Sequence, residues 1–226
     1  VGQGARQRCA LLHAARQLLG VVPLKAVQPD LSDEAFCNFE LLRTGREKIL
    51  TVEDPVEYEL AGVPQVPVNE KAGVTFANTL RAMLRQDPDI ILVGEIRDFE
   101  TAEIAVKAAL TGHQVLSTMH CNDAPGAISR LDDMGIAPFL ISSSVILSCA
   151  QRLMRRICPA CKEPVNYQNK IYEQLDLDPK FFAGAQLFKG AGCERCKNSG
   201  YAGRTAIIEI MTVSDEIRKL VIARAS

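Results

Sequence analysis

Three short apolar runs of the sequence are each followed at once by side chains that could do chemistry. The runs at 49–52 and 90–93 lead into carboxylates, and the run at 115–118 leads into a histidine. Carboxylate oxygens are the ligands that Mg²⁺ prefers, and a carboxylate can also take a proton from an attacking water. The side chains concerned are Glu53, Asp54, Glu57, Glu95, Arg97, Asp98 and His120. Each cluster alone could be a set of solvated carboxylates, but three in succession favour a ligand site.

Four of the eight cysteines form a second group with chemical potential. They occur as two C-x-x-C pairs, Cys158/Cys161 and Cys193/Cys196, with 31 residues between the pairs. Four thiolates in this pattern are typical of a closed, tetrahedral, structural zinc site. The alternative is a set of reduced cysteines without metal. The remaining cysteines are scattered along the chain and predict no disulfide framework.

Alternating strands and helices must position these side chains. Apolar runs predict strands at 49–52, 90–93, 115–118 and 206–210. Caps and apolar periodicity predict helices from Thr75 to just before Asp87, at 99–110, 123–134 and 138–157, and after Ser214. This alternation predicts an α/β fold, a doubly wound and mostly parallel sheet that binds ligands at the carboxyl ends of its strands.

The pattern changes along the chain, which indicates four segments. Residues 1–47 have no clear period, and residues 48–157 carry the α/β core. Residues 158–204 hold both cysteine pairs and several glycines, which predicts a small inserted zinc-binding lobe. Residues 205–226 return to the core, and their last helix has no stop signal, so we expect this end to be truncated.

The ordered motifs from 49 to 204 resemble the type II secretion and type IV pilus assembly ATPases. These motifs are T-V-E-D-P-V-E-Y at 51–58 (the Asp box), L-R-x-x-L-R-Q-D-P-D at 80–89, the Walker B-like I-I-L-V-G-E-I-R-D at 90–98, T-G-H-x-V-L-S-T-x-H-x-N-D-A at 111–124 (the His box), A-Q-R-L at 150–153 and the cysteine pairs. The resemblance implies a RecA-like ATPase domain of a hexameric motor, with ATP, Mg²⁺ and Zn²⁺ as ligands.

The resemblance also implies roles for individual residues. Glu95 would polarise the attacking water, and His120 would sense or position the γ-phosphate. Glu53, Asp54 and Glu57 are expected near magnesium and the γ-phosphate. The further residues expected at or near the nucleotide are Arg81, Arg85, Arg97, Asp98 and His113, the last with a more structural role. For the two arginines at 81 and 85, a solvated helix face is an equally good interpretation.

One family motif is missing from the sequence. A phosphate-binding loop, G-x-x-x-x-G-K-[ST], is expected upstream of the Asp box, but no Gly-Lys-Ser or Gly-Lys-Thr occurs in the chain. Without the lysine and the backbone nest, both nucleotide affinity and hydrolysis should fall steeply. Residues 1–47 could be frame-shifted or chimeric, the loop could have decayed, or the chain could begin downstream of it. Whether the chain is an active enzyme is therefore left open.

Three functions remain as hypotheses. The first is an ATP-hydrolysing motor that drives pilus assembly or type II secretion through an inner-membrane platform protein. The second is a non-hydrolysing ring subunit that binds that platform and other motor subunits. The third, a separate zinc-ribbon interaction protein, explains only residues 158–204. The cysteine lobe favours secretion and pilus-extension motors over retraction motors of the same superfamily.

The composition of the chain narrows the classes of protein to which it could belong. The net charge of −1 gives no sign of a nucleic-acid partner, and 47% apolar with 23% charged residues is ordinary for a globular protein. No apolar run approaches the roughly 20 residues of a membrane span, and no secretory signal opens the chain. We therefore expect a cytoplasmic protein, peripheral to the inner membrane.

Overall fold

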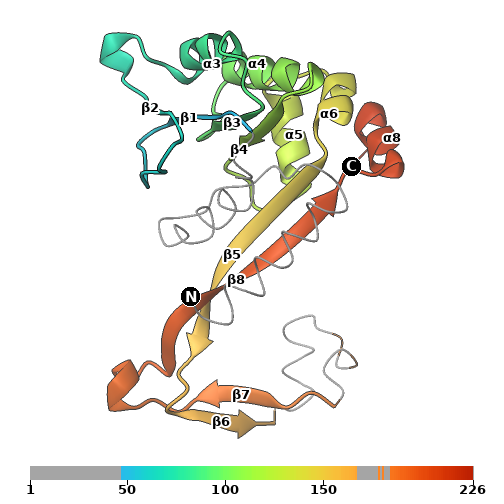
Figure 1. The fold of residues 1–226 in the computed structure, drawn as a ribbon. Helices are drawn as coiled ribbons and strands as arrows, with labels where there is room; N and C mark the ends of the chain where they lie inside the picture. Colours follow the sequence, from blue (N-terminus) through green and yellow to red (C-terminus); the bar gives the residue numbers. More distant parts are fainter. Residues whose placement is uncertain (1–46, 167–177, 179, 181–183, 226) are drawn as a thin grey trace. The chain divides into compact units, whose positions relative to one another are not determined.

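The computed structural model describes residues 47–166, 178, 180 and 184–225, so all but the last residue of the segment predicted at 1–47 lies outside the described residues. The described chain forms two compact units (Figure 1). Unit 1 comprises the described residues up to Gln151 and from Ile208, and unit 2 comprises Arg152–Ile207.

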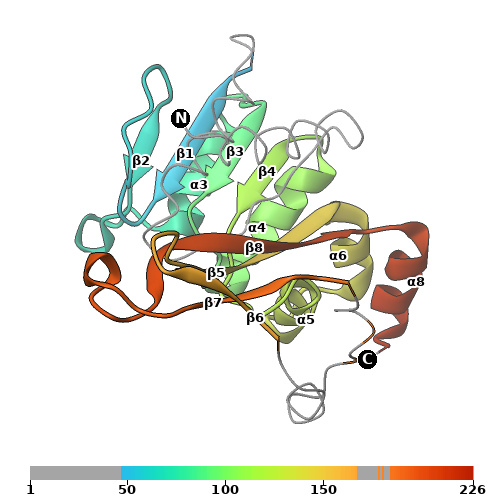
Figure 2. The ribbon, with the colours of Figure 1, turned by 90° about the horizontal axis from the view of Figure 1, so that it is seen from below.

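A parallel sheet forms the centre of unit 1. In the described residues its strands are β1 (Ile49–Glu53), β2 (Gln65–Pro67), β3 (Ile90–Val93) and β4 (Gln114–Ser117), in the order β2-β1-β3-β4 (Figure 2). Every pairing between neighbours is parallel. The three predicted strands that precede the polar clusters are therefore confirmed. The short edge strand β2 was not predicted.

Two capped helices connect these strands. Helix α3 (Phe76–Leu84) begins where the Thr75 side chain accepts a hydrogen bond from the Asn78 backbone, and α4 (Phe99–Leu110) begins in the same way at Asp98. Successive right-handed crossovers in one direction place both helices on one face of the sheet, as Figure 1 shows. A doubly wound sheet carries helices on both faces, and the described connecting helices cover only one.

Strand side chains alternate between the two faces and build two clusters. Leu50, Val52, Ile91 and Val93 point to the helical face and join the large core with α3 and α4. The opposite face carries a smaller cluster around Leu116, closed partly by the loop between β1 and β2. Because both faces are covered, the strands read as continuous apolar runs rather than as alternating ones.

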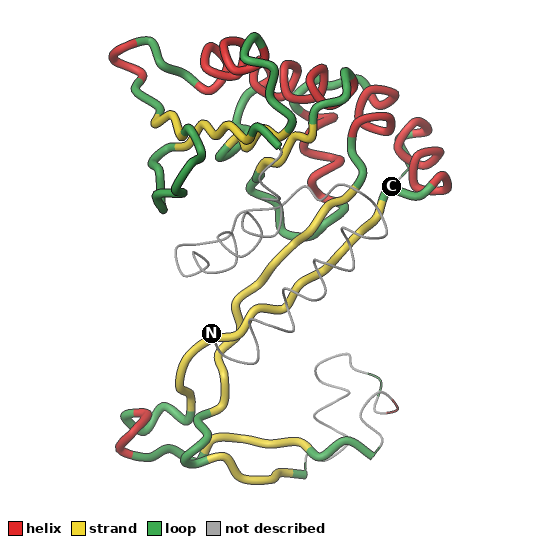
Figure 3. The backbone as a smooth tube through the Cα atoms, in the orientation of Figure 1, coloured by secondary structure: helices red, strands yellow, loops and turns green. Residues whose placement is uncertain are grey.

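The predicted helix at 138–157 is correct at its start and wrong beyond Ser144. Helices α5 (Gly126–Asp133) and α6 (Pro138–Ser144) are followed by a long strand, β5 (Leu147–Ile157), which Figure 3 shows as the change from helix to strand. The hydroxyls of Ser143 and Ser144 bond to carbonyls one turn back, which weakens a helix end. The β-branched residues that follow prefer extended backbone.

Strand β8 (Tyr201–Thr212) pairs with β5, and both strands pass from one unit to the other. Strand β8 begins five residues before the strand predicted at 206–210. In unit 2, β6 (Lys162–Val165) and β7 (Leu187–Gly190) form an antiparallel pair. The final helix, α8 (Asp215–Ala223), is capped by Ser214 as predicted and packs against α6.

Candidate functional site

The carboxyl ends of β1, β3 and β4 meet at one edge of the sheet. The register pairs Val52 with Val93 and Val93 with Ser117. Beyond the strands, the Gly94 backbone donates to the Val52 carbonyl at 2.7 Å, and the Thr118 hydroxyl donates to the Gly94 carbonyl at 2.5 Å. These bonds hold the residues that follow each strand, so the three polar clusters are brought to the same edge.

Glu95 lies at the centre of this edge. Its side chain is only 14% exposed, and its Oε1 is paired with the Arg97 guanidinium, which also lies 3.7 Å from Asp54 Oδ2. His120 Nε2 lies 3.4 Å from Glu95 Oε2, within ion-pair distance. That buried oxygen has no hydrogen-bond partner among the described residues, because the contact with His120 lacks hydrogen-bond geometry. One oxygen of Glu95 is thus held, and the other is available to accept a proton.

Arg97 is the cation that balances this acidic edge. Its hydrogen bond to Glu95 raises the pKa of the guanidinium, partly opposed by burial, and the charges of Glu95, Asp54 and Glu70 raise it further. Glu70 lies in the short 3₁₀ helix η1 (Glu70–Ala72), so a fourth segment of the chain contributes a carboxylate to this field. The carboxylates outnumber the cations, which is the charge balance that a bound Mg²⁺ would complement.

Glu53 is oriented by two neighbours. Its Oε1 accepts hydrogen bonds from the hydroxyl of Thr51 at 2.5 Å and from Gln65 Nε2 at 2.9 Å. The same Gln65 nitrogen donates to the Tyr58 carbonyl, and Gln65 Oε1 accepts from the Leu60 backbone at 2.6 Å. Gln65 therefore ties the loop after β1 to Glu53. Sequence reasoning missed this residue, because a lone glutamine in an unpredicted edge strand gives no signal.

Gly94 is a second residue that sequence reasoning did not single out. A Cβ built on it would lie 3.1 Å from the Val52 carbonyl oxygen and 3.2 Å from the Glu53 Cα. Both neighbours are backbone atoms, which cannot move aside easily. The glycine lets the turn after β3 approach the end of β1, and this approach sets the position of Glu95. Its place between a buried strand and an acidic residue is the signal that could have found it.

Asp98 and His113 have local structural uses. Both oxygens of Asp98 accept hydrogen bonds from Thr101, from its backbone at 2.8 Å and its hydroxyl at 2.9 Å, which caps α4. His113 precedes β4 and therefore lies at the amino end of the sheet, opposite the edge that holds Glu95. Its Nδ1 is 3.1 Å from the Ala108 carbonyl. The structure does not bring His113 together with the other predicted site residues.

Arg81, Arg85 and Glu57 also lie apart from Glu95 in their contacts. Arg81 forms an ion pair at 2.7 Å with Glu100, and both side chains are about half exposed. Arg85 is the C-cap of α3, and Glu57 is exposed in the loop after β1. None of the three has a hydrogen bond or ion pair to another predicted site residue in the described part of the chain.

An open cavity of about 830 Å³ borders β4 and extends to Ile96 and Met119, beyond the ends of β3 and β4. Its lining includes Ile90, His113, Gln114 and Ser117, and it contains neither Glu53 nor Glu95. The buried Gln114 Nε2 has no hydrogen-bond partner among the described residues. The cavity therefore borders the carboxylate edge without including Glu53, Asp54 or Glu95.

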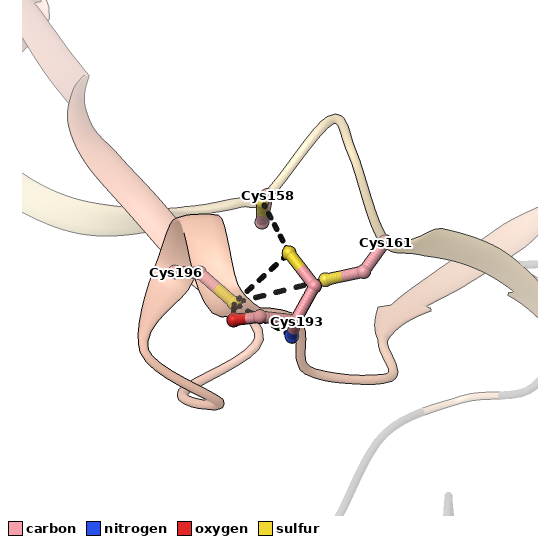
Figure 4. Close-up of side chains that lie close together, drawn as sticks. All are labelled: Cys158, Cys161, Cys193 and Cys196. Carbon is pink, nitrogen blue, oxygen red and sulfur yellow. Dashed lines mark hydrogen bonds between the residues drawn. The ribbon is translucent and has the colours of Figure 1, made fainter.

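The four paired cysteines meet in unit 2, as predicted (Figure 4). Cys158 follows β5, and Cys161 precedes β6. Cys193 precedes the 3₁₀ turn η3 (Glu194–Cys196), and Cys196 is the last residue of that turn. The sulfur atoms of the pairs Cys158–Cys193, Cys161–Cys196 and Cys193–Cys196 are 3.9, 3.8 and 3.7 Å apart. A tetrahedral ion with Zn–S bonds of about 2.3 Å requires sulfur separations of about 3.8 Å. The geometry fits zinc.

The backbone around the cluster favours thiolate at one position. Burial would raise the pKa of Cys196, but hydrogen bonds from the Cys193 and Gly200 backbones and from neighbouring thiols lower it to about 6. Burial and the neighbouring thiols raise the pKa of Cys161. Gly200 has φ +74°, and a Cβ on it would lie 2.7 Å from the Gly190 carbonyl oxygen, so only glycine fits this turn.

Residues 37–226 match the family model described as "Type II/IV secretion system protein". The chain belongs to the type II/IV secretion system protein family. It is 52% identical over 201 residues to the type IV pilus assembly ATPase PilB of Thermus thermophilus, which covers 88% of this chain and 23% of the relative. It is 54% identical over 177 residues to type II secretion system protein E of Dickeya dadantii, which covers 78% of this chain and 35% of the relative. The chain thus spans well under half the length of these family members.

A solved structure supports the same family assignment. The pilus retraction motor PilT with bound ADP is similar with a TM-score of 0.61 and 25% identity, over 90% of this chain and 50% of that one. The ATPase DotB of Legionella pneumophila shares the fold, with a TM-score of 0.56 and 20% identity over 97% of this chain and 51% of that one. The chain therefore shares its α/β fold with these structural neighbours.

Proposed function

We propose that this chain is part of an ATP-hydrolysing motor subunit that powers type IV pilus assembly or type II protein secretion. One observation carries the proposal: in a member of the secretion ATPase family, Glu95 has one oxygen held by Arg97 and a second, buried oxygen without a hydrogen-bond partner among the described residues. A carboxylate held in this way is suited to accept a proton from water at the edge where parallel sheets bind ligands.

Each residue at the edge then has a role in hydrolysis. Glu53 and Asp54 would hold Mg²⁺, which supplies charge neutralisation for the phosphates. Glu95 accepts the proton of the attacking water, and Arg97 holds the other oxygen of Glu95 and orients the carboxylate. The His120 side chain is 93% exposed, so its ring is free to meet the γ-phosphate of ATP entering from solvent. We propose Glu57, Arg81, Arg85 and Asp98 for the nucleotide-binding region, and for His113 the more structural role within the His box.

Turnover in this chain should be impaired, because the sequence holds no G-x-x-x-x-G-K-[ST]. Electrostatic stabilisation of the transferring phosphoryl group depends strongly on such a loop and its lysine. The same observation favours a second candidate function, a non-hydrolysing ring subunit or binding module that contacts the inner-membrane platform protein. In both functions the subunit would act in a homo-oligomeric ring at the cytoplasmic face of the inner membrane. None of the described helices is long and apolar enough to cross that membrane.

We further propose that residues 48–157 and 205–226 form the ATPase core, and that residues 158–204 form a lobe folded around one Zn²⁺. The sulfur separations support a closed tetrahedral site with no open position for substrate. The ion would therefore be structural, and its binding energy would contribute to folding a lobe that has little apolar core of its own.

Magnesium-dependent release of phosphate from ATP distinguishes the two functions. The Glu95→Gln variant keeps the shape of the side chain but cannot accept the proton. Glu103→Gln, which alters an exposed ion pair with Lys107, is the matched control. Release that persists in the control and is lost with Glu95→Gln supports the motor. If the unchanged chain releases no more phosphate than the Glu95→Gln variant, the motor function is overturned for this chain and the binding subunit is favoured.

A further inference from the structure

The side-chain amide of Gln65 is held in one orientation by its hydrogen bonds. Its Nε2 donates to Oε1 of Glu53 and to the Tyr58 carbonyl, each at 2.9 Å, and so uses both of its hydrogens. Its Oε1 accepts from the Leu60 backbone at 2.6 Å. A flipped amide would place acceptor against acceptor and donor against donor, so these three bonds fix which end meets Glu53. Gln65 therefore presents an N–H donor to the carboxylate.

The second donor to Glu53 comes from the paired strand. Thr51 on β1 is the register partner of Gln65 on β2, and it lies two residues before Glu53, on the same face of the sheet. The Thr51 hydroxyl donates at 2.5 Å to Oε1 of Glu53, the same oxygen that accepts from Gln65. A carboxylate oxygen has two lone pairs, so both are used. Thr51 is fully buried, which keeps water from competing for this bond.

The other oxygen of Glu53 is open. Its Oε2 has no hydrogen bond or ion pair within the described part of the chain. The Glu53 carbonyl accepts from the Val68 backbone at 2.8 Å, so the residue is anchored through its backbone as well as through Oε1. Asp54 and Glu95 are divided in the same way, because Arg97 lies against one oxygen of each. Each of these three carboxylates therefore leaves one oxygen for a ligand.

We propose that Gln65 is a positioning residue which, together with Thr51, limits Glu53 to a single oxygen for a bound cation and so biases the site against Ca²⁺. The inference rests on the magnesium role proposed above for Glu53. Mg²⁺ binds through one or two carboxylates and keeps several waters, whereas Ca²⁺ takes about six to eight oxygens and gains from carboxylates that offer both of theirs. A carboxylate with one oxygen already occupied therefore suits Mg²⁺ and deprives Ca²⁺ of a ligand.

The same hydrogen bonds also tie the loop after β1 to β2, which is a structural role for Gln65. The two roles affect different quantities. Loss of the loop tie lowers stability and weakens every cation at Glu53 alike. Loss of the donor to Oε1 changes the relative affinity for two cations, because only Ca²⁺ gains from the second oxygen. The ratio of the two affinities therefore separates the positioning role from the structural one.

Displacement of Mn²⁺ from the full chain, without nucleotide, tests the inference. Mn²⁺ suits the same oxygen ligands as Mg²⁺, and its paramagnetism lets electron paramagnetic resonance measure the free and bound ion directly. Titration with Mg²⁺ and with Ca²⁺ gives the concentration of each that displaces half of the bound Mn²⁺. Only binding that is lost in the Glu53→Gln variant is counted, because this variant keeps the shape of the side chain and removes its charge.

Two variants each remove one donor. Gln65→Met keeps the length of the side chain, and Thr51→Val keeps its shape and leaves the loop untouched. In each, Ca²⁺ should displace Mn²⁺ at about a fivefold lower concentration than in the unchanged chain, relative to Mg²⁺. Gln114→Met is the matched control, since Gln114 Nε2 has no hydrogen-bond partner among the described residues. This control should leave the ratio unchanged, and circular dichroism confirms that each variant is folded.

The outcomes separate this inference from the function on which it rests. If Glu53→Gln lowers Mn²⁺ binding but neither donor variant changes the ratio of the Ca²⁺ and Mg²⁺ concentrations, Gln65 serves the loop alone and the inference is overturned. If the unchanged chain binds no more Mn²⁺ than Glu53→Gln, the magnesium role of Glu53 falls as well. A ratio that shifts toward Ca²⁺ in the donor variants, and not in Gln114→Met, supports the inference whatever the rate of ATP hydrolysis.

Discussion

The imidazole Nε2 of His120 lies 3.4 Å from Oε2 of Glu95, a contact between a side chain that is 93% exposed and one that is 14% exposed. The carboxylate of Glu95 is mostly buried, whereas the ring of His120 faces solvent. A ligand that enters from solvent therefore meets His120 before Glu95. The second histidine of the His box, His113, lies at the other end of β4. The two histidines therefore form a natural pair for comparison.

His120→Ala should lower magnesium-dependent phosphate release about tenfold or more, because positioning of the reacting groups at Glu95 is lost. His113→Ala should leave release per folded molecule unchanged. It should instead lower the free energy of unfolding by about 1 kcal/mol, since the hydrogen bond with the Ala108 carbonyl is lost. Phosphate release and urea unfolding of both variants measure these effects. Equal loss of release in the two variants would contradict the separation of their roles.

Arg97→Lys keeps the charge but not the geometry. The guanidinium contacts Glu95 through one nitrogen and lies 3.7 Å from Asp54 through another, which a single ammonium group does not reproduce. We expect about a tenfold loss in phosphate release with little change in unfolding free energy, since Arg97 is more than half exposed. Arg130→Lys, at an exposed position of α5, is the matched control. A wild-type rate for Arg97→Lys would show that charge alone suffices.

Gly94→Ala should destabilise unit 1 by about 1–3 kcal/mol, because its Cβ would press on the backbone of Val52 and Glu53. Urea unfolding followed by circular dichroism measures the loss. In the control Gly126→Ala, the added Cβ meets the Asp123 carboxylate, a side chain that can move aside. The control should change stability much less, and the prediction fails if both glycines tolerate alanine equally.

Metal analysis of the purified chain should find about one zinc per molecule. Cys158→Ser should remove it and expose unit 2 to proteolysis, because the lobe loses the binding energy that holds it folded. Cys121→Ser alters a cysteine outside the cluster and should retain the metal. A folded, protease-resistant unit 2 without zinc would contradict a structural metal.

Cys149 should be protected from alkylation while the chain is folded. Burial raises the pKa of its thiol to about 11 from an ordinary value of 9.0. A raised pKa in the folded state contributes stability that is fully present below about pH 9 and is lost as the pH rises through about 11. Iodoacetamide at pH 8 should therefore label Cys149 only in denaturant. Mass spectrometry of the labelled protein measures the extent of labelling at Cys149. Rapid labelling of Cys149 in the folded protein would show that its strand opens readily.

The parts of the fold that were predicted correctly are those with a single dominant signal. Buried apolar runs marked β1, β3 and β4, and capping side chains marked the starts of α3 and α8. The C-x-x-C spacing was sufficient to group the cysteines, because metal ligands must converge whatever the surrounding fold.

The errors arose where short-range signals competed. The segment 138–157 has apolar residues at helical spacing, but its serines and β-branched residues end the helix at Ser144. Residues that act by packing or bridging left no trace in the pattern. Gln65 reaches Glu53 only because β2 pairs with β1, and Gly94 matters only because two strand ends approach closely.

The β6–β7 ladder pairs Val165 with Leu187, so the chain leaves and returns at adjacent positions. A peptide inserted between these two residues would therefore begin and end at paired positions of one ladder. A peptide tag or a small fluorescent reporter placed there would have its two ends anchored side by side and would not alter the spacing of the cysteines within either pair. Cells carrying such a tagged chain would allow the protein to be located by microscopy without fusion to either terminus.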